Sequence, residues 1–305
     1  MSGSMNNLPG IDVRRSSRER ERRRRRVKRG GRRAYIRSVQ MLPSLATLGN
    51  ALCGFGAIYV VTLGEVQSDP IASALFDNRF IIAVYLIGLA MVCDALDGRL
   101  ARFARHTTDF GGQLDSLADA ISFGAAPAVI ALQTFKFEGV EVPLVVGRLV
   151  WAVGGLYVAC ALVRLARFNV SNEHGEENHR SFLGLPSPGA AGVVLGLVLM
   201  QQDLMIEAQD ETNLLPTSVL SGLGIAATIL IPPVLAASAL LMVSNVRYPH
   251  FVNRLARGSK GIGRLVTIVA VLLALVVAHR YTLGLVGIVF LLTGPISHLR
   301  ARWVK

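Results

Sequence analysis

The sequence predicts an all-α, polytopic membrane protein, and three observations lead to this class. Hydrophobic residues make up 52% of the 305 residues and charged residues only 17%, whereas an average soluble domain carries roughly 25% charged residues. The mean hydropathy is +0.47. Apolar runs long enough to cross a bilayer, which takes ~20 helical residues, recur along the chain. This composition excludes disorder for most of the chain and disfavours a soluble globule.

Residues 1–40 are expected to form a disordered, arginine-rich arm on the cytoplasmic side. Residues 1–43 contain fourteen Lys or Arg against three acidic residues, so they hold nearly all of the net charge of +12. A run such as Arg22 to Arg26 cannot bury a core. Anionic lipid headgroups are the expected partner, at about 1 kcal/mol for each basic residue near the surface. A nucleic-acid arm is the alternative, although no specific nucleic acid is expected.

The apolar runs predict about eight spans. They cover residues 43–63, 80–98, 116–134, 147–168, 186–202, 217–243, 265–279 and 282–298. The last two are separated only by a short polar break at residues 279–281, so they are expected to form a C-terminal hairpin, or one interrupted hairpin. The resulting fold is a bundle of transmembrane helices.

Loop charges predict the orientation of these spans. If the arm is cytoplasmic, the cytoplasmic segments beyond it carry fourteen basic residues, whereas the opposite loops carry only Arg79, Lys136, Arg148 and Arg280. Cytoplasmic loops of membrane proteins are enriched in Lys and Arg. The pattern indicates an even number of spans, both termini inside, and a location in the cytoplasmic membrane.

Four aspartates mark the edge of the membrane between the second and third spans. Asp94 and Asp97 are three residues apart, and Asp115 and Asp119 are four apart, so each pair shares one helix face. A turn between the two spans brings these faces together. Four facing carboxylates do not all remain ionised without cations, and hard divalent ions with oxygen ligands suit them. The sequence therefore predicts a Mg²⁺ or Mn²⁺ site.

Small residues and one arginine accompany the acids. Gly98, Ala101 and Gly111 leave room for a bulky ligand, and Arg102 is placed to meet a phosphate. Carboxylates, metal and arginine around a small-residue cleft are typical of a site that handles a pyrophosphate. A solvent-exposed acidic and basic loop is the alternative interpretation.

Residues 94–119 match a known signature. The chain contains Asp94-x2-Asp97-Gly98-x2-Ala101-Arg102-x8-Gly111-x3-Asp115-x3-Asp119. This pattern resembles, position by position, the signature of the CDP-alcohol phosphatidyltransferase family. The resemblance implies a six-helix membrane core that takes a CDP-linked lipid or alcohol, releases CMP and forms a phosphodiester.

The resemblance also implies roles for individual residues. Asp94, Asp97 and Asp115 match the metal ligands of the family. Asp119 matches its fourth aspartate, a metal ligand and the general base for the acceptor hydroxyl. Four further positions match residues that shape or contact the CDP site: Gly98, Ala101, Arg102 and Gly111.

Segments outside the signature resemble the bacterial and archaeal members that use CDP-diacylglycerol and L-serine. They are residues 42–56, 115–127, 164–169, 183–189 and 242–249. The resemblance covers about residues 42–250, which suggests a membrane domain at 41–250 followed by a hairpin and basic tail at 251–305. It implies phosphatidylserine as product, CDP-diacylglycerol entering from the cytoplasmic leaflet, and a homodimer.

Several of these residues have two interpretations. Thr47 and Asn50 either serve helix packing or, as the resemblance implies, contact the cytidine nucleotide. Arg164 and Arg167 either extend to the membrane surface or bind a phosphate or the serine carboxylate. Ser187, in the helix-breaking stretch Leu-Pro-Ser-Pro-Gly, belongs either to a helix cap or to the wall of the serine pocket.

Other functions stay open at the level of sequence. The same chemistry with glycerol 3-phosphate, inositol phosphate or choline as acceptor is compatible with the signature. An ion-coupled transporter would use intramembrane acids, but it predicts them near mid-span and leaves the glycines and Arg102 unexplained. A scaffold that tethers nucleic acid through the arm is the third alternative.

Overall fold

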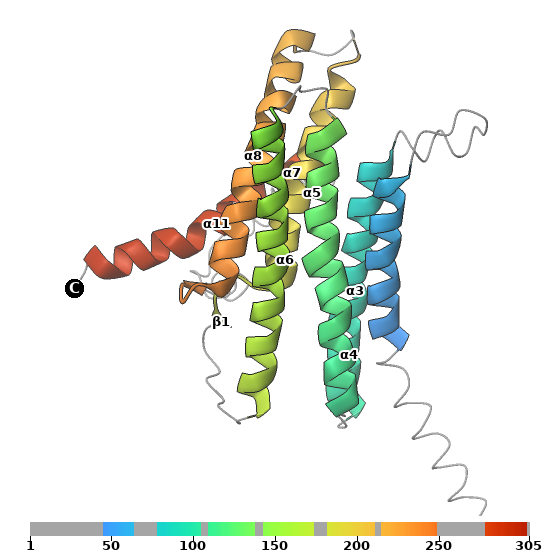
Figure 1. Ribbon diagram of the computed structural model, residues 1–305, viewed down its shortest axis with the longest axis vertical. Helices are drawn as coiled ribbons and strands as arrows, with labels where there is room; N and C mark the ends of the chain where they lie inside the picture. The colour runs from blue at the N-terminus through green and yellow to red at the C-terminus, as the bar shows by residue number, and fades with distance from the viewer. Residues whose placement is uncertain are drawn as a thin grey trace, which may run out of the picture.

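The computed structural model describes residues 45–63, 78–104, 109–137, 143–173, 182–210, 215–248 and 278–303. The predicted arm at 1–40 lies outside these residues, as does all but the end of the predicted span at 265–279. Within the described ranges, seven helices are long and apolar enough to cross a membrane. The predicted class, a polytopic helical bundle, is confirmed (Figure 1).

The described helices follow the predicted spans closely, with most ends extended by a few residues. They are the first helix at Leu45–Thr62, α3 at Arg79–Ala104, α4 at Asp109–Asp119, the π-helical η1 at Ala120–Ala125, α5 at Ala126–Phe137, α6 at Leu144–Glu173, α7 at Ser187–Glu207, α8 at Thr217–Val243 and α11 at His279–Trp303. Because α4, η1 and α5 follow one another without a break, they form a single span.

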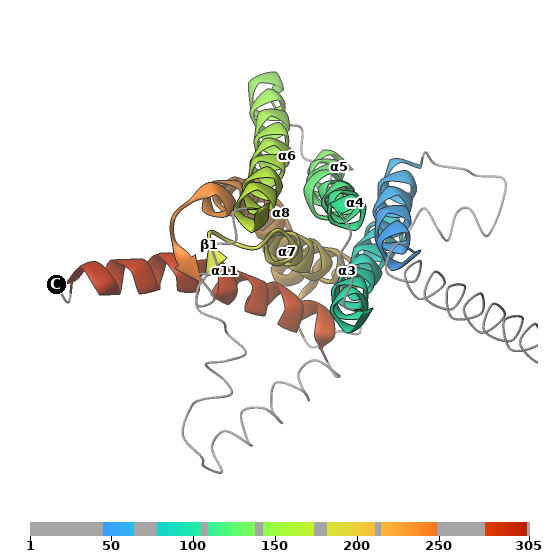
Figure 2. The ribbon, with the colours of Figure 1, turned by 90° about the horizontal axis from the view of Figure 1, so that it is seen from below.

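Helix α7 lies at the centre of the bundle. It packs against α8, α11 and α3, and Figure 2 shows these helices surrounding it. Its sequence explains the position, because apolar and small residues occupy nearly every place from Ala190 to Leu199 and most are fully buried. A helix that is apolar all round is suited to a buried core. The outer helices instead expose large apolar side chains, as contact with lipid requires.

A short strand pair, which the all-α prediction did not include, links two loops at one end of the bundle. Strand β1 at Phe182–Leu183 pairs antiparallel with β2 at Arg247–Tyr248. Between β1 and α7, Gly184 has a φ of +81°, and a Cβ there would lie 2.4 Å from the carbonyl oxygen of Met242. Only glycine fits this turn. The pair ties the start of α7, and with it Ser187, to the end of α8.

The C-terminal helix α11 runs across the bundle rather than along it (Figures 1 and 2). Glycines allow its close approach to α7. A Cβ on Gly196 would lie 2.8 Å from the carbonyl oxygen of Leu283, and one on Gly284 would lie 3.0 Å from that of Gly196. Small residues at crossing points are the usual basis of helix packing in membranes. The predicted span 282–298 therefore packs directly on the central helix.

Candidate active site

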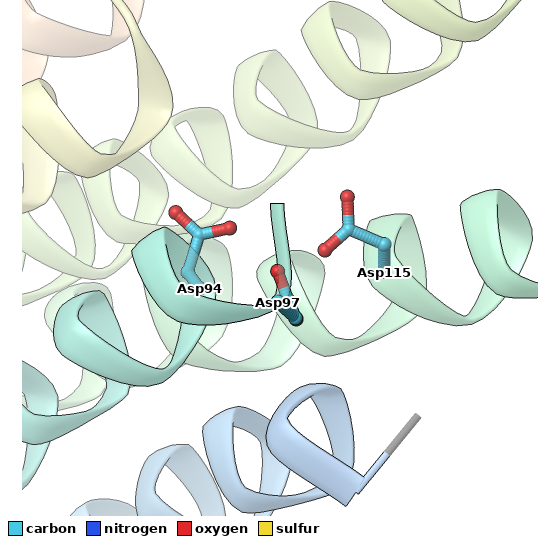
Figure 3. A group of neighbouring side chains, drawn as sticks. All are labelled: Asp94, Asp97 and Asp115. Atoms are coloured by element: carbon cyan, nitrogen blue, oxygen red, sulfur yellow. The ribbon is translucent and has the colours of Figure 1, made fainter. Parts of the chain in front are cut away.

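Three of the predicted aspartates meet between α3 and α4. Asp94 and Asp97 project from the same face of α3, and Asp115 projects from α4. Each offers a carboxylate oxygen, and these oxygens all lie within 4.8 Å of one another. Figure 3 shows the three carboxylates gathered between the two helices, with the first helix beside them. The hairpin geometry predicted from the spacing of the aspartates brings these residues together.

This carboxylate set suits a hard divalent cation. Asp97 is only 5% exposed, and Asp115 Oδ1 is buried with no hydrogen-bond partner among the described residues. Buried carboxylates in mutual contact repel one another unless a cation or proton separates them. Oxygen-only ligands of this kind match Mg²⁺ or Mn²⁺ better than softer metals. The residues present therefore fit the metal that the sequence predicts.

Asp119 lies one helical turn deeper than Asp115 and outside the group of three. Its carboxylate still interacts electrostatically with Asp94, Asp115 and Asp97. Asn50 of the first helix donates a hydrogen bond from Nδ2 to Asp119 Oδ1 at 3.0 Å. Directly after Asp119 the helix changes to the π-helical segment η1, a distortion that is frequent at functional sites.

The first helix supports the aspartates from one side. Thr47 Oγ1 donates to Asp97 Oδ2 at 2.8 Å, and Ser122 Oγ of η1 donates to the backbone oxygen of Asn50 at 2.8 Å. Gly54 allows this contact, since a Cβ there would lie 2.3 Å from Ser122 Oγ. Thr47 and Asn50 thus hydrogen-bond to the acidic residues, so the packing of the first helix also positions these carboxylates.

Helix α6 faces the same site from the other side. Arg164 donates from Nη1 to Ser187 Oγ at 2.6 Å, and its charge interacts favourably with Asp119. Its Nε is buried and has no partner among the described residues. Nearby, the buried Tyr157 donates from its hydroxyl to the backbone oxygen of Phe123 in η1 at 3.2 Å. Arg164 is therefore held near Asp119, and its Nε–H is a hydrogen-bond donor that no described residue uses.

The two arginines of residues 164–169 lie in different surroundings. Arg167 is exposed and donates to Asn245 Oδ1 at 3.2 Å, whereas Arg164 is partly buried beside Ser187 and Asp119. The structure brings Arg164 and Ser187 together as the sequence suggested, but it does not bring Arg167 into that group.

The small residues of the signature are partly visible. Among the residues that the structure describes, a Cβ on Gly98 would meet nothing within 4 Å, so these residues leave open space beside Asp97. Gly111 is half-buried within α4. Ala101 and Arg102 continue α3, but their side chains lie outside the described part.

Sequence reasoning assigned no role to three polar residues that bond to or lie beside the predicted site residues. Ser122 and Asn245 bond Asn50 and Arg167, and Ser116 lies between the two aspartates of α4. Their presence in the segments 115–127 and 242–249 was the only available signal, because their partners come from other helices.

Comparison with known proteins identifies the family. The model of the CDP-alcohol phosphatidyltransferase family matches residues 40–231. The chain belongs to this family. It is therefore a multi-pass membrane enzyme, and the matched range contains all four aspartates and both helices that face them. The transporter interpretation loses its support, since Asp94 and Asp97 also lie in the last part of α3 rather than at its middle.

Curated relatives share one printed name, CDP-diacylglycerol–serine O-phosphatidyltransferase. The protein from Helicobacter pylori is 32% identical over 217 residues, which cover 71% of this chain and 75% of the relative. That from Methanocaldococcus jannaschii is 30% identical over 170 residues, or 56% and 65% of the two chains. The Bacillus subtilis protein is 26% identical over 217 residues, or 70% and 92%.

Proposed function

We propose that this enzyme transfers the phosphatidyl group of CDP-diacylglycerol to the hydroxyl of L-serine, forming phosphatidylserine and releasing CMP. The main observation in favour is the pairing of Arg164 with Ser187 beside Asp119, which offers a cation for the serine carboxylate next to a base for its hydroxyl. The printed names of the relatives support the same substrates.

In this proposal Asp94, Asp97, Asp115 and Asp119 hold one or two Mg²⁺ or Mn²⁺ ions. A bound divalent cation neutralises a diphosphate and stabilises the negative charge that develops on phosphorus and on the leaving group. Thr47 and Asn50 orient the carboxylates through the hydrogen bonds described above. Gly98, Ala101, Arg102 and Gly111 complete the site for the CDP moiety, where the open space at Gly98 leaves room for the ligand.

Asp119 acts as general base in the proposed reaction. Asn50 occupies its Oδ1, which leaves Oδ2 to take the hydroxyl proton of serine. The serine oxygen then forms a bond to the phosphatidyl phosphorus while the bond from phosphorus to the CMP oxygen breaks. Arg164, whose Nε has no hydrogen-bond partner within the described ranges, fixes the serine carboxylate so that the hydroxyl faces phosphorus. Arg167 is a second candidate for a phosphate or carboxylate at the mouth of the site.

We further propose a cytoplasmic location for the site and for both termini, contact of the arginine-rich arm with anionic headgroups, and a homodimer. The loop charges support the orientation. CDP-diacylglycerol would reach the aspartates from the inner leaflet while its acyl chains stay in lipid.

The test is CMP release by purified, detergent-solubilised enzyme with CDP-diacylglycerol and Mg²⁺ or Mn²⁺. L-Serine is offered first, then glycerol 3-phosphate, inositol phosphate and choline. We expect release with serine only, lost in Asp119→Asn and retained in the control Asp210→Asn, which changes an exposed carboxylate at the other end of α7. Release with a different alcohol would keep the chemistry and overturn the acceptor.

A further inference from the structure

Helix α4 lies between the first helix and α6 (Figure 2), and α6 interacts with its acidic end at two levels. At the deeper level Arg164 interacts with Asp119. Nearer the end of the bundle, Asn169 meets Ser116, the residue that directly follows Asp115. Because α4 and α6 run in opposite directions, residues later in α6 lie beside residues earlier in α4. Arg164 and Asn169 are five residues apart, or about 7.5 Å along the helix.

The contact between Ser116 and Asn169 fixes the orientation of an amide. Ser116 Oγ donates to Asn169 Oδ1 at 3.0 Å and lies 3.2 Å from the backbone oxygen of Gly112. Since the oxygen of the amide faces the hydroxyl, Nδ2 keeps both of its N–H donors for a partner other than Ser116. Within the described ranges no protein acceptor contacts this nitrogen, and Asn169 is half-exposed.

An oriented amide donor at this place suits an anionic oxygen of a substrate. The neighbouring helix face already presents the carboxylates of Asp115 and Asp119, which do not attract an anion. A side chain that recognises an anion at this place must therefore donate a hydrogen bond rather than accept one. Nδ2 instead offers a neutral donor that can bind carboxylate or phosphate without neutralising the metal ligands. Together with Arg164 it gives α6 two donors that flank the reaction centre.

We infer that Asn169 is a substrate-binding residue whose Nδ2 donates to an anionic substrate oxygen, and that Ser116 is the positioning residue that orients it. This inference rests on the proposed function. The anionic oxygen belongs either to the serine carboxylate or to a phosphate of the CDP-lipid, and separate kinetic constants for the two substrates distinguish these sources.

The decisive variant is Asn169→Asp, which keeps the oxygen that accepts from Ser116 and replaces the amide donor with an acceptor. If the partner is the carboxylate, KM for serine rises by about 10- to 100-fold, the range for a hydrogen bond to a charged group, while KM for CDP-diacylglycerol and the melting temperature stay unchanged. If the partner is a phosphate, KM for CDP-diacylglycerol rises instead. Ser116→Ala should raise the same constant by a smaller factor.

The matched control is Gln113→Glu, the same exchange of amide for carboxylate on the exposed side of α4. It tests whether an added negative charge at this end of the bundle is sufficient to change either constant. If Asn169→Asp and Asn169→Ala fold and both KM values stay within about twofold of the wild type, the inference is wrong and the contact serves packing alone. Wild-type activity with each acceptor is measured first, so a wrong acceptor in the proposed function shows up separately.

Discussion

Two hydrogen bonds from the first helix determine how the acidic cluster is held. Thr47 and Asn50 are fully or almost fully buried in a helix that otherwise offers mainly apolar and small residues. A buried polar group without a partner is costly, and here the partners are Asp97 and Asp119. Groups that hydrogen-bond to metal ligands orient them and tune their affinity. The first helix therefore acts on the site through the carboxylates.

We predict that Thr47→Val lowers the apparent affinity for Mn²⁺ by about 10- to 100-fold, the usual effect of losing a hydrogen bond to a metal ligand. Valine has the shape of threonine but cannot donate to Asp97. The control is Thr62→Val on the same helix, because within the described part of the chain Thr62 bonds only to backbone oxygens of its own helix. Activity measured across a Mn²⁺ titration should shift for Thr47→Val alone. If both variants shift the Mn²⁺ titration by the same amount, Thr47 has no special role in orienting Asp97.

The unequal surroundings of Arg164 and Arg167 lead to a second prediction. Replacing each by Gln should lower kcat/KM for the acceptor about a hundredfold at Arg164 and far less at Arg167. The larger loss corresponds to roughly 3 kcal/mol, as expected when a charged hydrogen-bond donor is removed from a partly buried site. Steady-state kinetics of the two purified variants measure the ratio. Equal losses of kcat/KM would mean that both arginines contact the substrate.

At the level of elements, the close approach of the first helix to η1 is what brings Thr47 and Asn50 to the aspartates. This approach depends on Gly54, over which the backbone and side chain of Ser122 lie. The π-helical segment turns Ser122 toward the backbone oxygen of Asn50. The close contact between the first helix and η1 therefore depends both on Gly54 and on the π-helical backbone at Ser122.

We predict that Gly54→Ala disrupts this contact between the first helix and η1. A Cβ would lie 2.3 Å from Ser122 Oγ and 2.8 Å from its Cα, and overpacking of this kind costs roughly 1–3 kcal/mol. Activity should fall at least as far as in Thr47→Val, with a lower melting temperature in detergent. Gly56→Ala is the matched control on the same helix, since its Cβ would meet, among the described residues, only Leu86 at an ordinary 3.7 Å. An unchanged Gly54→Ala enzyme would disprove the close packing.

The helices themselves were predictable because hydropathy acts locally. The span predicted at 217–243 coincides with α8, and those at 43–63 and 186–202 end within a few residues of the helices found. The pairing of Asp94 and Asp97 with Asp115 followed from helical spacing. The π-helical segment after Asp119 and the contact between Ser116 and Asn169 did not follow, because each depends on contacts with residues distant in sequence.

For the whole molecule, the position of α11 bears on the number of spans. Strand β2 lies at the same end of the bundle as the start of α7. Arg280, at the start of α11, forms an ion pair with Asp203, which lies sixteen residues, or about 24 Å, along α7 from Ser187. The described chain thus leaves one end of the bundle at residue 248 and returns near the other at residue 278. A segment that crosses the membrane once would connect these two positions, as the span predicted at 265–279 does.

We predict from this arrangement that the C-terminus is cytoplasmic. In cells, green fluorescent protein fused after Lys305 should be fluorescent and alkaline phosphatase fused there should be inactive, because the phosphatase becomes active only after export. A phosphatase fusion after Asp210, at the far end of α7, is the control and should be active. Active phosphatase at both positions would mean an odd number of spans and would contradict the topology that the basic residues Arg300, Arg302 and Lys305 indicate. Since α11 starts near Asp203 of α7, a cytoplasmic C-terminus also requires α11 to run back toward the end of the bundle that holds Ser187, and Figure 1 shows α11 slanting across the bundle.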